Sequence, residues 1–346
     1  MIGNVESEII KYIQENKEVS SKDIFEGISS AVSYATLKRT LTKLLDDNLI
    51  SKKGQGRATK YSVSSSYGLL FPIDLEKYFE KELDEREIRE YYNFRLIPEI
   101  LTEANLFSTK ESEQLDLLQE KYKQNISQLS QVVYSKELER LAIDLSWKSS
   151  QIEGNTYSLL ETERLLKDKE TASGKTKEEA VMLLNHKDAI DFIIENPDYL
   201  IPLSVSKIED IHSILIKELG VGKNIRKRRV GISGTNYRPL DNEFQINEAL
   251  SEMCKLVNAK ESVFEKALLL LILISYIQPF EDGNKRTARI VSNAVLMNHQ
   301  YCPISFRTVD AVEYKKAMLI FYEQNNISCF KEIFIEQYRF AVETYF

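Results

Sequence analysis

The chain has 346 residues and a mass of 40.1 kDa, which is enough for two or three domains with a large buried core. Its formal net charge of -7 excludes a chain that is basic throughout, as many nucleic-acid-binding proteins are. We expect a cytoplasmic protein without membrane contact. Its three cysteines form no close pair, the sequence shows no leader pattern, and no apolar run is long enough to cross a bilayer.

Residues 1–65 are expected to form a separate module of three helices and a hairpin. Two serines at N-cap positions, Ser20 and Ser33, open the second and third helices. Residues 49–53 and 60–63 have the composition of two strands joined by a glycine-containing turn. This order of elements resembles a winged helix-turn-helix domain.

The charge of this module is opposite to that of the whole chain. Seven basic residues and two acidic residues lie between Ser33 and Lys60, a local balance of +5. The third helix and the hairpin, or wing, would place such side chains against phosphates, so we expect binding of double-stranded DNA. A basic face used for protein contacts is the alternative. The candidate DNA-binding residues are Lys38, Arg39, Lys43, Lys52, Lys53 and Arg57.

The rest of the chain is expected to be mainly α. Residues 66–136 have the charged pattern of a helical connecting region, and residues 137–346 that of a helical core. The apolar run 267–277 predicts a buried core helix. One exception is the segment 228–239, whose alternating residues around Ser-Gly-Thr-Asn predict a β-hairpin.

Residues 278–289, Gln-Pro-Phe-Glu-Asp-Gly-Asn-Lys-Arg-Thr-Ala-Arg, are the most informative part of the chain. Pro279 ends the apolar helix, and Gly283 permits a backbone conformation that a side chain would resist. A new helix is expected to begin at Asn284, where free amides form an anion site. Asp282, just before these amides, is placed to hold Mg²⁺ against a phosphate.

This stretch closely resembles the signature of the Fic (fido) family, whose proteins bind ATP and usually transfer AMP to a Ser, Thr or Tyr hydroxyl of a target protein. The resemblance implies a Fic-type helical core over residues 137–346, with ATP and Mg²⁺ as ligands. Asp282 resembles the family's metal ligand. The phosphates of the nucleotide would be bound by Gly283, Asn284, Lys285, Arg286 and Arg289.

The same resemblance gives the expected hairpin a function. It corresponds to the family's flap, which pairs with an extended segment of the target by strand addition. A plain surface hairpin is the alternative. The target-binding residues would be Val230, Gly231, Ile232, Ser233 and Gly234.

Two positions depart from the family signature. Gln278 stands where the family has its catalytic His, and an amide cannot take up the proton of an attacking hydroxyl. The three histidines, His186, His212 and His299, are all expected to lie in helices away from the motif. Lys285 stands where many members have Gly; the Doc branch of the superfamily also has Lys there and transfers a phosphoryl group.

A second motif, Ser149-Ser-Gln-Ile-Glu153-Gly, matches the family's inhibitory pattern. The resemblance implies an inhibitory helix at about 138–155 in which Ser149 and Glu153 belong to the inhibitory motif. Glu153 would pair with Arg289 and occupy the donors that otherwise bind the γ-phosphate of ATP. An exposed glutamate at a helix end is the alternative.

Three functions follow from these features. The first is a transferase that acts on a hydroxyl of a protein, with the chain itself as one possible target. The second is a catalytically impaired regulator that binds nucleotide and DNA. The third is a scaffold. The intact phosphate residues and Glu153 disfavour the scaffold, and Gln278 favours the impaired regulator. By resemblance, a homodimer is the expected assembly.

Overall fold

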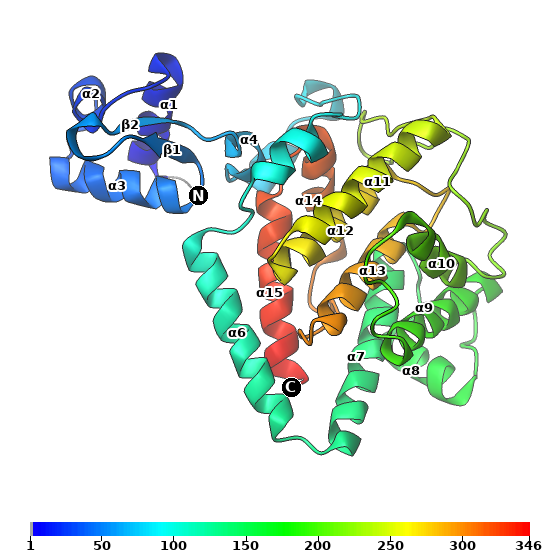
Figure 1. The fold of residues 1–346 in the computed structure, drawn as a ribbon. Coiled ribbons are helices and arrows are strands. Elements are labelled where there is room, and N and C mark those ends of the chain that lie inside the picture. Colours follow the sequence, from blue (N-terminus) through cyan, green and yellow to red (C-terminus); the bar gives the residue numbers. More distant parts are fainter. Residues whose placement is uncertain (1–2) are drawn as a thin grey trace.

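The computed structural model describes residues 3–346, and helices dominate it (Figure 1). The N-terminal module contains α1 (Asn4–Asn16), α2 (Ser21–Gly27), α3 (Tyr34–Asp46), β1 (Ile50–Lys53) and β2 (Lys60–Val63). The following segment contains α4 (Tyr67–Leu70), α5 (Leu75–Phe79), a π-helical turn (Leu96–Leu101) and α6 (Thr109–Ser127). The core contains α7 (Gln131–Ile152), α8 (Leu159–Asp168), α9 (Lys177–Glu195), α10 (Val205–Leu215), α11 (Glu243–Ala259), α12 (Val263–Ile277), α13 (Asn284–Asn298), α14 (Ala311–Gln324) and α15 (Ser328–Thr344).

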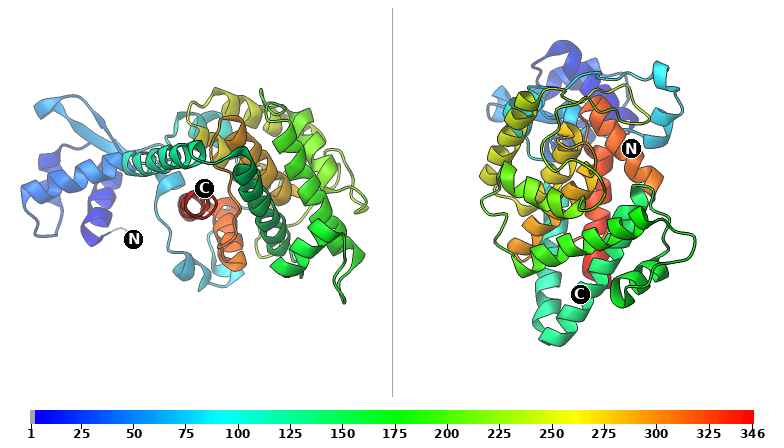
Figure 2. Two further views of the ribbon diagram at one scale, coloured as in Figure 1. Left: turned by 90° about the horizontal axis from the view of Figure 1, so that it is seen from below. Right: turned by 90° about the vertical axis from the view of Figure 1, so that its right-hand side faces the viewer.

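The N-terminal module has the predicted order of elements and lies to one side of the helical body (Figures 1 and 2). The hydroxyl of Ser20 accepts a bond from the amide of Asp23 and starts α2, and Ser33 accepts from Thr36 and starts α3. β1 and β2 pair antiparallel, with Ile50 opposite Val63. The expected three helices and hairpin are therefore confirmed.

The connecting region is helical only in part. Between α5 and the π-helical turn, the chain has irregular backbone apart from one short 3₁₀ turn at Leu83–Glu85. Some of its polar groups bond to the core: Arg86 pairs with Glu323 of α14, and the amide of Asn93 bonds to the hydroxyl of Tyr276 in α12. These contacts keep the segment on the core surface without a helix.

The helices α12 and α13 form the centre of the core. All of α12 except Lys266 is buried, as its nearly unbroken apolar sequence predicts. α13 packs against it and buries both arginines of the signature, Arg286 and Arg289, at about 1% and 0% exposure. Burial on this scale fixes the direction of α13, and therefore the place of its N-terminus. None of the helices in residues 3–346 combines the length and apolar composition that a bilayer crossing requires.

The hairpin predicted at residues 228–239 does not form. Its turn is present at Ser233–Gly234, where Gly234 has a φ of +87°, but no ladder joins the two arms. The amide of Arg238 bonds instead to the carbonyl of Glu90 at 2.7 Å, and the Tyr237 hydroxyl to the carbonyl of Tyr276 at 3.1 Å. Because these contacts hold the second arm against the connecting region and α12, it is not free to pair with the first.

Candidate functional site

The backbone between α12 and α13 makes a sharp turn at the signature. Gln278 follows α12 with a φ of +51°, and Gly283 precedes α13 with a φ of +82°. A Cβ at Gly283 would lie 3.3 Å from Ile216 and 3.4 Å from His212, so both conformation and space favour glycine here. Within residues 3–346, the amides of residues 284–286 at the start of α13 form no hydrogen bond, so an anion bound there would find free donors.

Asn284 holds this loop closed from the inside. Its Oδ1 accepts a bond from the amide of Phe280 at 2.9 Å. Its Nδ2 donates to the carbonyl of Phe280 and to Oε1 of Gln278, each at 2.9 Å. Asn284 is 5% exposed, so these bonds are shielded from water and shape the turn around the amides of α13.

Gln278 uses both ends of its side-chain amide within the protein. While Oε1 accepts from Asn284, Nε2 donates to the carbonyl of Ser275 at 2.6 Å. The residue is 9% exposed yet lines the cavity described below. An amide in this position can orient a neighbour but cannot take up a proton.

Asp282 and Arg286 form an ion pair of 2.9 Å. The arginine is 1% exposed, while the aspartate side chain is 63% exposed and lines the cavity. One exposed carboxylate suits Mg²⁺ that arrives largely coordinated by phosphates and water. Within residues 3–346, no cluster of three His, Cys, Asp or Glu side chains offers an independent metal site.

Arg289 is completely buried and faces the end of α7. Its Nε donates to the Ser149 hydroxyl at 2.8 Å, and its Nη2 donates to the Ser149 carbonyl at 3.0 Å and to Oε1 of Glu153 at 2.8 Å. Lys285 donates to the other oxygen of the same carboxylate, also at 2.8 Å. Burial opposes ionisation of Glu153, but Arg289 and Lys285 outweigh it and lower the pKa of Glu153 to about 2.

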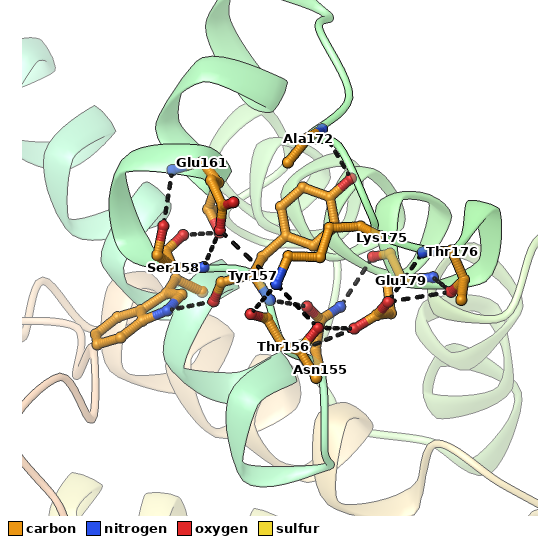
Figure 3. Close-up of polar contacts among 11 residues, drawn as sticks. Asn155, Thr156, Tyr157, Ser158, Glu161, Ala172, Lys175, Thr176 and Glu179 are labelled. Carbon is orange, nitrogen blue, oxygen red and sulfur yellow. Dashed lines mark hydrogen bonds and ion pairs between the residues drawn. The ribbon is translucent and has the colours of Figure 1, made fainter.

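α7 ends at Ile152 because Gly154 follows with a φ of +104°, which leaves Glu153 at the helix C-cap. The turn beyond it is fastened to the N-terminus of α9 (Figure 3). Oε1 of Glu179 accepts from the amide and the hydroxyl of Thr156 at 2.8 and 2.6 Å, and Lys175 donates to the Thr156 carbonyl. The pKa of Glu179 falls to about 2, chiefly because the Thr156 hydroxyl and the Thr176 amide donate to it. This carboxylate therefore fixes the turn that carries Glu153.

A cavity of about 400 Å³ lies between the signature, the end of α7 and the loop before α11. Its lining brings together the predicted inhibitory Glu153, Gln278 and the first residues of the predicted flap. The lining also includes one side of α14. The sequence analysis did not predict this contribution, because α14 shows only an amphipathic pattern there. The lining residues from α14 are Lys315, Met318, Leu319 and Tyr322.

Residues 221–240, here called the mouth loop, border the cavity and are pinned by the buried Arg226. Its Nε donates to the carbonyl of Gln278 at 2.6 Å, Nη1 to the carbonyl of Arg228 at 2.8 Å, and Nη2 to the carbonyl of Leu240. Arg86 donates to the carbonyl of Gly234 at the tip of the loop. The predicted flap residues thus lie at the cavity, with Val230, Gly231, Ile232 and Ser233 in its lining and Gly234 adjacent.

His212 contacts the signature, contrary to the expectation that all three histidines lie away from it. Its Nε2 is 2.9 Å from the carbonyl oxygen of Asp282 and its Nδ1 is 3.3 Å from that of Lys223, and its ring stacks on Phe280. Burial lowers the pKa of His212. Because both nitrogens face main-chain oxygens and the residue does not line the cavity, it supports the loop and does not replace the missing base.

The Fic/DOC family model matches residues 202–296, which include the mouth loop and the signature. The chain contains a Fic/DOC domain. Curated relatives include Protein adenylyltransferase Fic from Nematostella vectensis, 31% identical over 179 residues, and that from Culex quinquefasciatus, 27% identical over 168 residues. These matches cover 49% and 46% of this chain but only 40% and 32% of the relatives, so the chain spans less than half the length of either.

Solved structures show the same fold for the Fic/DOC domain and the helices around it. Fic-1 (aa134–508) from C. elegans has a TM-score of 0.60 at 19% identity, over 68% of this chain and 72% of that chain. A Fic domain containing signaling protein from Bacteroides thetaiotaomicron has a TM-score of 0.57 at 20% identity, over 66% of this chain and 95% of that chain. Identities this low establish the fold and leave substrates open.

The penicillinase repressor family model matches residues 2–85, ahead of the Fic/DOC domain. Lys38 and Arg39 are exposed on α3, and Lys52 and Lys53 are exposed on β1. The side chain of Arg57 lies outside the described part of the structure. Lys43 is also exposed, but its side chain pairs with Glu6 at 2.6 Å and lines a cleft between the module and the core.

Proposed function

We propose that the Fic/DOC domain binds ATP with Mg²⁺ at the N-terminus of α13 and is held in a restrained state by Glu153. The main support for this proposal is that Ser149 and Glu153 already use the hydrogen-bond donors of Arg289, at Nε and Nη2. A carboxylate in that position uses the donors that a terminal phosphate would need. Asn284, Arg286 and the free amides of α13 would hold the remaining phosphates.

The charges at this point explain why the restraint would be reversible. Glu153 is one anion between two cations, Arg289 and Lys285, and a phosphate group carries more negative charge and more acceptor oxygens than a carboxylate. Nη1 of the buried Arg289 has no hydrogen-bond partner among the described residues. ATP would therefore compete with Glu153 for these cations and gain a donor that the carboxylate leaves unused.

Calorimetry with MgATP tests the proposal on the full chain. Glu153→Gly should raise the affinity for ATP by about tenfold or more, because it frees a buried guanidinium. Glu281→Gly is the matched control, since Glu281 lines the same cavity without forming an ion pair in the described structure. Equal ATP affinity in the Glu153→Gly variant and the parent chain would show that Glu153 is not the restraint.

The reaction we propose for the bound nucleotide is transfer of AMP to a Ser, Thr or Tyr hydroxyl of a protein, at a low rate. The curated relatives are named protein adenylyltransferases, and the signature retains its phosphate residues. The low rate follows from Gln278, whose amide cannot take the proton of the attacking hydroxyl. If the base is absolutely required, the same site acts as a nucleotide sensor.

Lys285 supports a second candidate reaction, Doc-type transfer of a phosphoryl group. Its ammonium lies 2.8 Å from Glu153 at the edge of the phosphate site, where it could hold a γ-phosphate toward the acceptor. ATP labelled on the α-phosphate or on the γ-phosphate separates the two reactions. If protein is labelled only by ATP that carries the label on its γ-phosphate, the reaction is phosphoryl transfer and not adenylyl transfer.

For the N-terminal module we propose binding of duplex DNA through α3 and the β1–β2 hairpin. The match to the penicillinase repressor model and the exposed bases Lys38, Arg39, Lys52 and Lys53 support it. A mobility-shift assay should show an affinity that falls steeply with salt. Absence of binding at low salt would favour a protein-contact role for this module.

A further inference from the structure

The mouth loop has an unusual charge for this chain. Residues 221–240 contain six basic residues and no acidic residue, within a chain whose net charge is -7. Arg226 is buried and spends its donors on main-chain carbonyls, so its role is structural. The other five side chains are exposed, on a loop whose residues 230–233 line the cavity: Lys223, Lys227, Arg228, Arg229 and Arg238.

The middle of the loop also offers a short stretch of free backbone. The carbonyls of Arg228 and Gly234 are taken by Arg226 and Arg86. Between them, the main-chain groups of residues 230–233 form no hydrogen bond to the described part of the protein. These residues line the cavity, so an extended segment pairing with them would bring a side chain toward the phosphate site.

The existing ion pairs leave this positive charge available. Lys227 pairs with Glu243, Arg229 with Asp241 and Arg238 with Glu90, at 3.3, 2.7 and 4.0 Å. The three basic side chains are 75%, 86% and 67% exposed, and pairs this exposed contribute little free energy, so they can exchange partners.

The remaining two bases have no such partner. Lys223 and Arg228 form no ion pair within residues 3–346, and neither side chain takes part in a described hydrogen bond. They flank Arg226 on either side, near the pinned end of the loop. They are therefore the two exposed bases of the loop that no described carboxylate pairs with.

We propose that the mouth loop selects acidic target segments, in which Asp or Glu residues flank the hydroxyl that enters the cavity. This inference rests on the proposed function, because it names the class of polypeptide that the same site would modify. Backbone pairing with residues 230–233 would align the segment, and the surrounding bases would set its charge preference. A basic segment would meet Lys223 and Arg228, whose charge no described carboxylate offsets, and would be disfavoured.

The loop is less suited to nucleic acid than to an acidic peptide. Glu90, Asp241 and Glu243 stand among its bases, and Glu281 and Asp282 line the cavity below it. A phosphate backbone presents charge at close, regular intervals and would meet these carboxylates as well. Carboxylate side chains on a peptide can be spaced to avoid them.

Fluorescence anisotropy with short synthetic peptides tests the inference without nucleotide. Each peptide carries one central Tyr flanked by Glu, by Gln or by Lys. The full chain should bind the Glu peptide about tenfold more tightly than the Gln peptide and bind the Lys peptide least, with a preference that declines as salt rises. Lys223→Glu combined with Arg228→Glu should abolish the preference for the Glu peptide.

Lys136→Glu is the matched control. Lys136 is exposed on α7, 17 residues before Glu153, which places it about 25 Å from the site along the helix. Equal binding of the Glu and Gln peptides, or the same loss in the control, would overturn the inference. Binding of single-stranded DNA that is lost with the same two substitutions would also overturn it. ATP binding by the Glu153→Gly variant is measured separately. If that variant binds ATP, a negative peptide result counts against the acidic-segment proposal and not against the proposed nucleotide site.

Discussion

Glu153 and Lys285 form an ion pair of 2.8 Å on the carboxylate oxygen that Arg289 leaves free. The restraint that we propose would therefore have two cationic anchors, one of them completely buried and one near the surface. Lys285 belongs to the signature itself, so the same side chain stabilises the restrained form and lies where phosphates would bind. Its two roles can be separated by combining substitutions.

A double-mutant cycle on Glu153→Gly and Lys285→Gly should show coupling. With Glu153 present, loss of Lys285 weakens both the restraint and the phosphate site, and the two effects partly cancel in the ATP affinity. With Glu153 absent, loss of Lys285 only removes a cation and lowers the affinity. We expect a coupling free energy of about 1 kcal/mol by calorimetry. The cycle of Glu281→Gly with Lys285→Gly is the comparison and should give additive effects.

Gln278→His should increase labelling of protein by ATP. A histidine at this position supplies a group that can take a proton near neutral pH, which typically raises the rate on the order of 10²- to 10⁴-fold. The increase should be largest when Glu153→Gly is also present, because ATP binding and the base are then both restored. Gln278→Asn is the control for disruption of the bonds to Asn284 and Ser275. Equal labelling by the Gln and His forms would show that the reaction needs no base here.

Glu179→Gln should loosen the restraint from a distance. Its carboxylate accepts the bonds that fix the turn after Glu153, and an amide retains only part of this acceptor capacity. We expect faster hydrogen exchange at residues 153–158 and a rise in ATP affinity of roughly threefold. Glu178→Gln, an exposed neighbour on the same helix turn, should leave both unchanged. If exchange accelerates and ATP affinity stays constant, the turn does not govern Glu153.

Mild acid should not release the restraint. The pKa of Glu153 lies at about 2, below the usual 4.5, so its contribution to folding is complete above pH 4.5 and is lost only as the pH falls toward 2. The ratio of ATP affinities between Glu153→Gly and the parent chain should therefore be the same at about pH 7 and about pH 5. A ratio that collapses at the lower pH would mean that Glu153 is already protonated there and is held more weakly than its contacts indicate.

Lys38→Ala with Arg39→Ala should weaken duplex DNA binding and lower its dependence on salt, because both side chains are exposed on α3. Lys43→Ala should have little effect, since Lys43 pairs with Glu6 beside the core. This pair of variants compares basic residues on one helix of which only Lys43 pairs with an acidic side chain of the module. Equal losses would mean that DNA contacts the C-terminal end of α3 as well.

Features that are local in the sequence could be predicted, because local interactions produce them. Ser20 and Ser33 cap their helices through bonds that span three residues, and Gly283 has the positive φ that the turn before α13 requires. The Glu153–Arg289 ion pair spans 136 residues and was accessible only through resemblance to a family. No pattern in composition or periodicity would have connected those two positions.

Other features depend on competition between distant partners and were missed. The arms at residues 228–239 have a hairpin pattern, but Glu90 takes the amide of Arg238 that a ladder would use, and Tyr276 holds the side chain of Tyr237. Nothing nearby in the sequence distinguishes the buried Arg226 from the exposed Arg228 or Arg229. Lys43 has the spacing of the recognition helix, and its ion pair with Glu6, 37 residues away, cannot be seen in that spacing.

The bonds from Arg226 and Arg86 to the mouth loop also limit how much of a partner's sequence this protein could distinguish. With the carbonyls at Arg228 and Gly234 already used, the free backbone that lines the cavity is residues 230–233, four residues or roughly 13 Å of extended chain. A partner segment that pairs over so short a length would be recognised as a short linear motif, in which one or two side chains determine binding. Such motifs arise easily in unrelated sequences, so partners would be selected largely by which proteins meet this one in the cell.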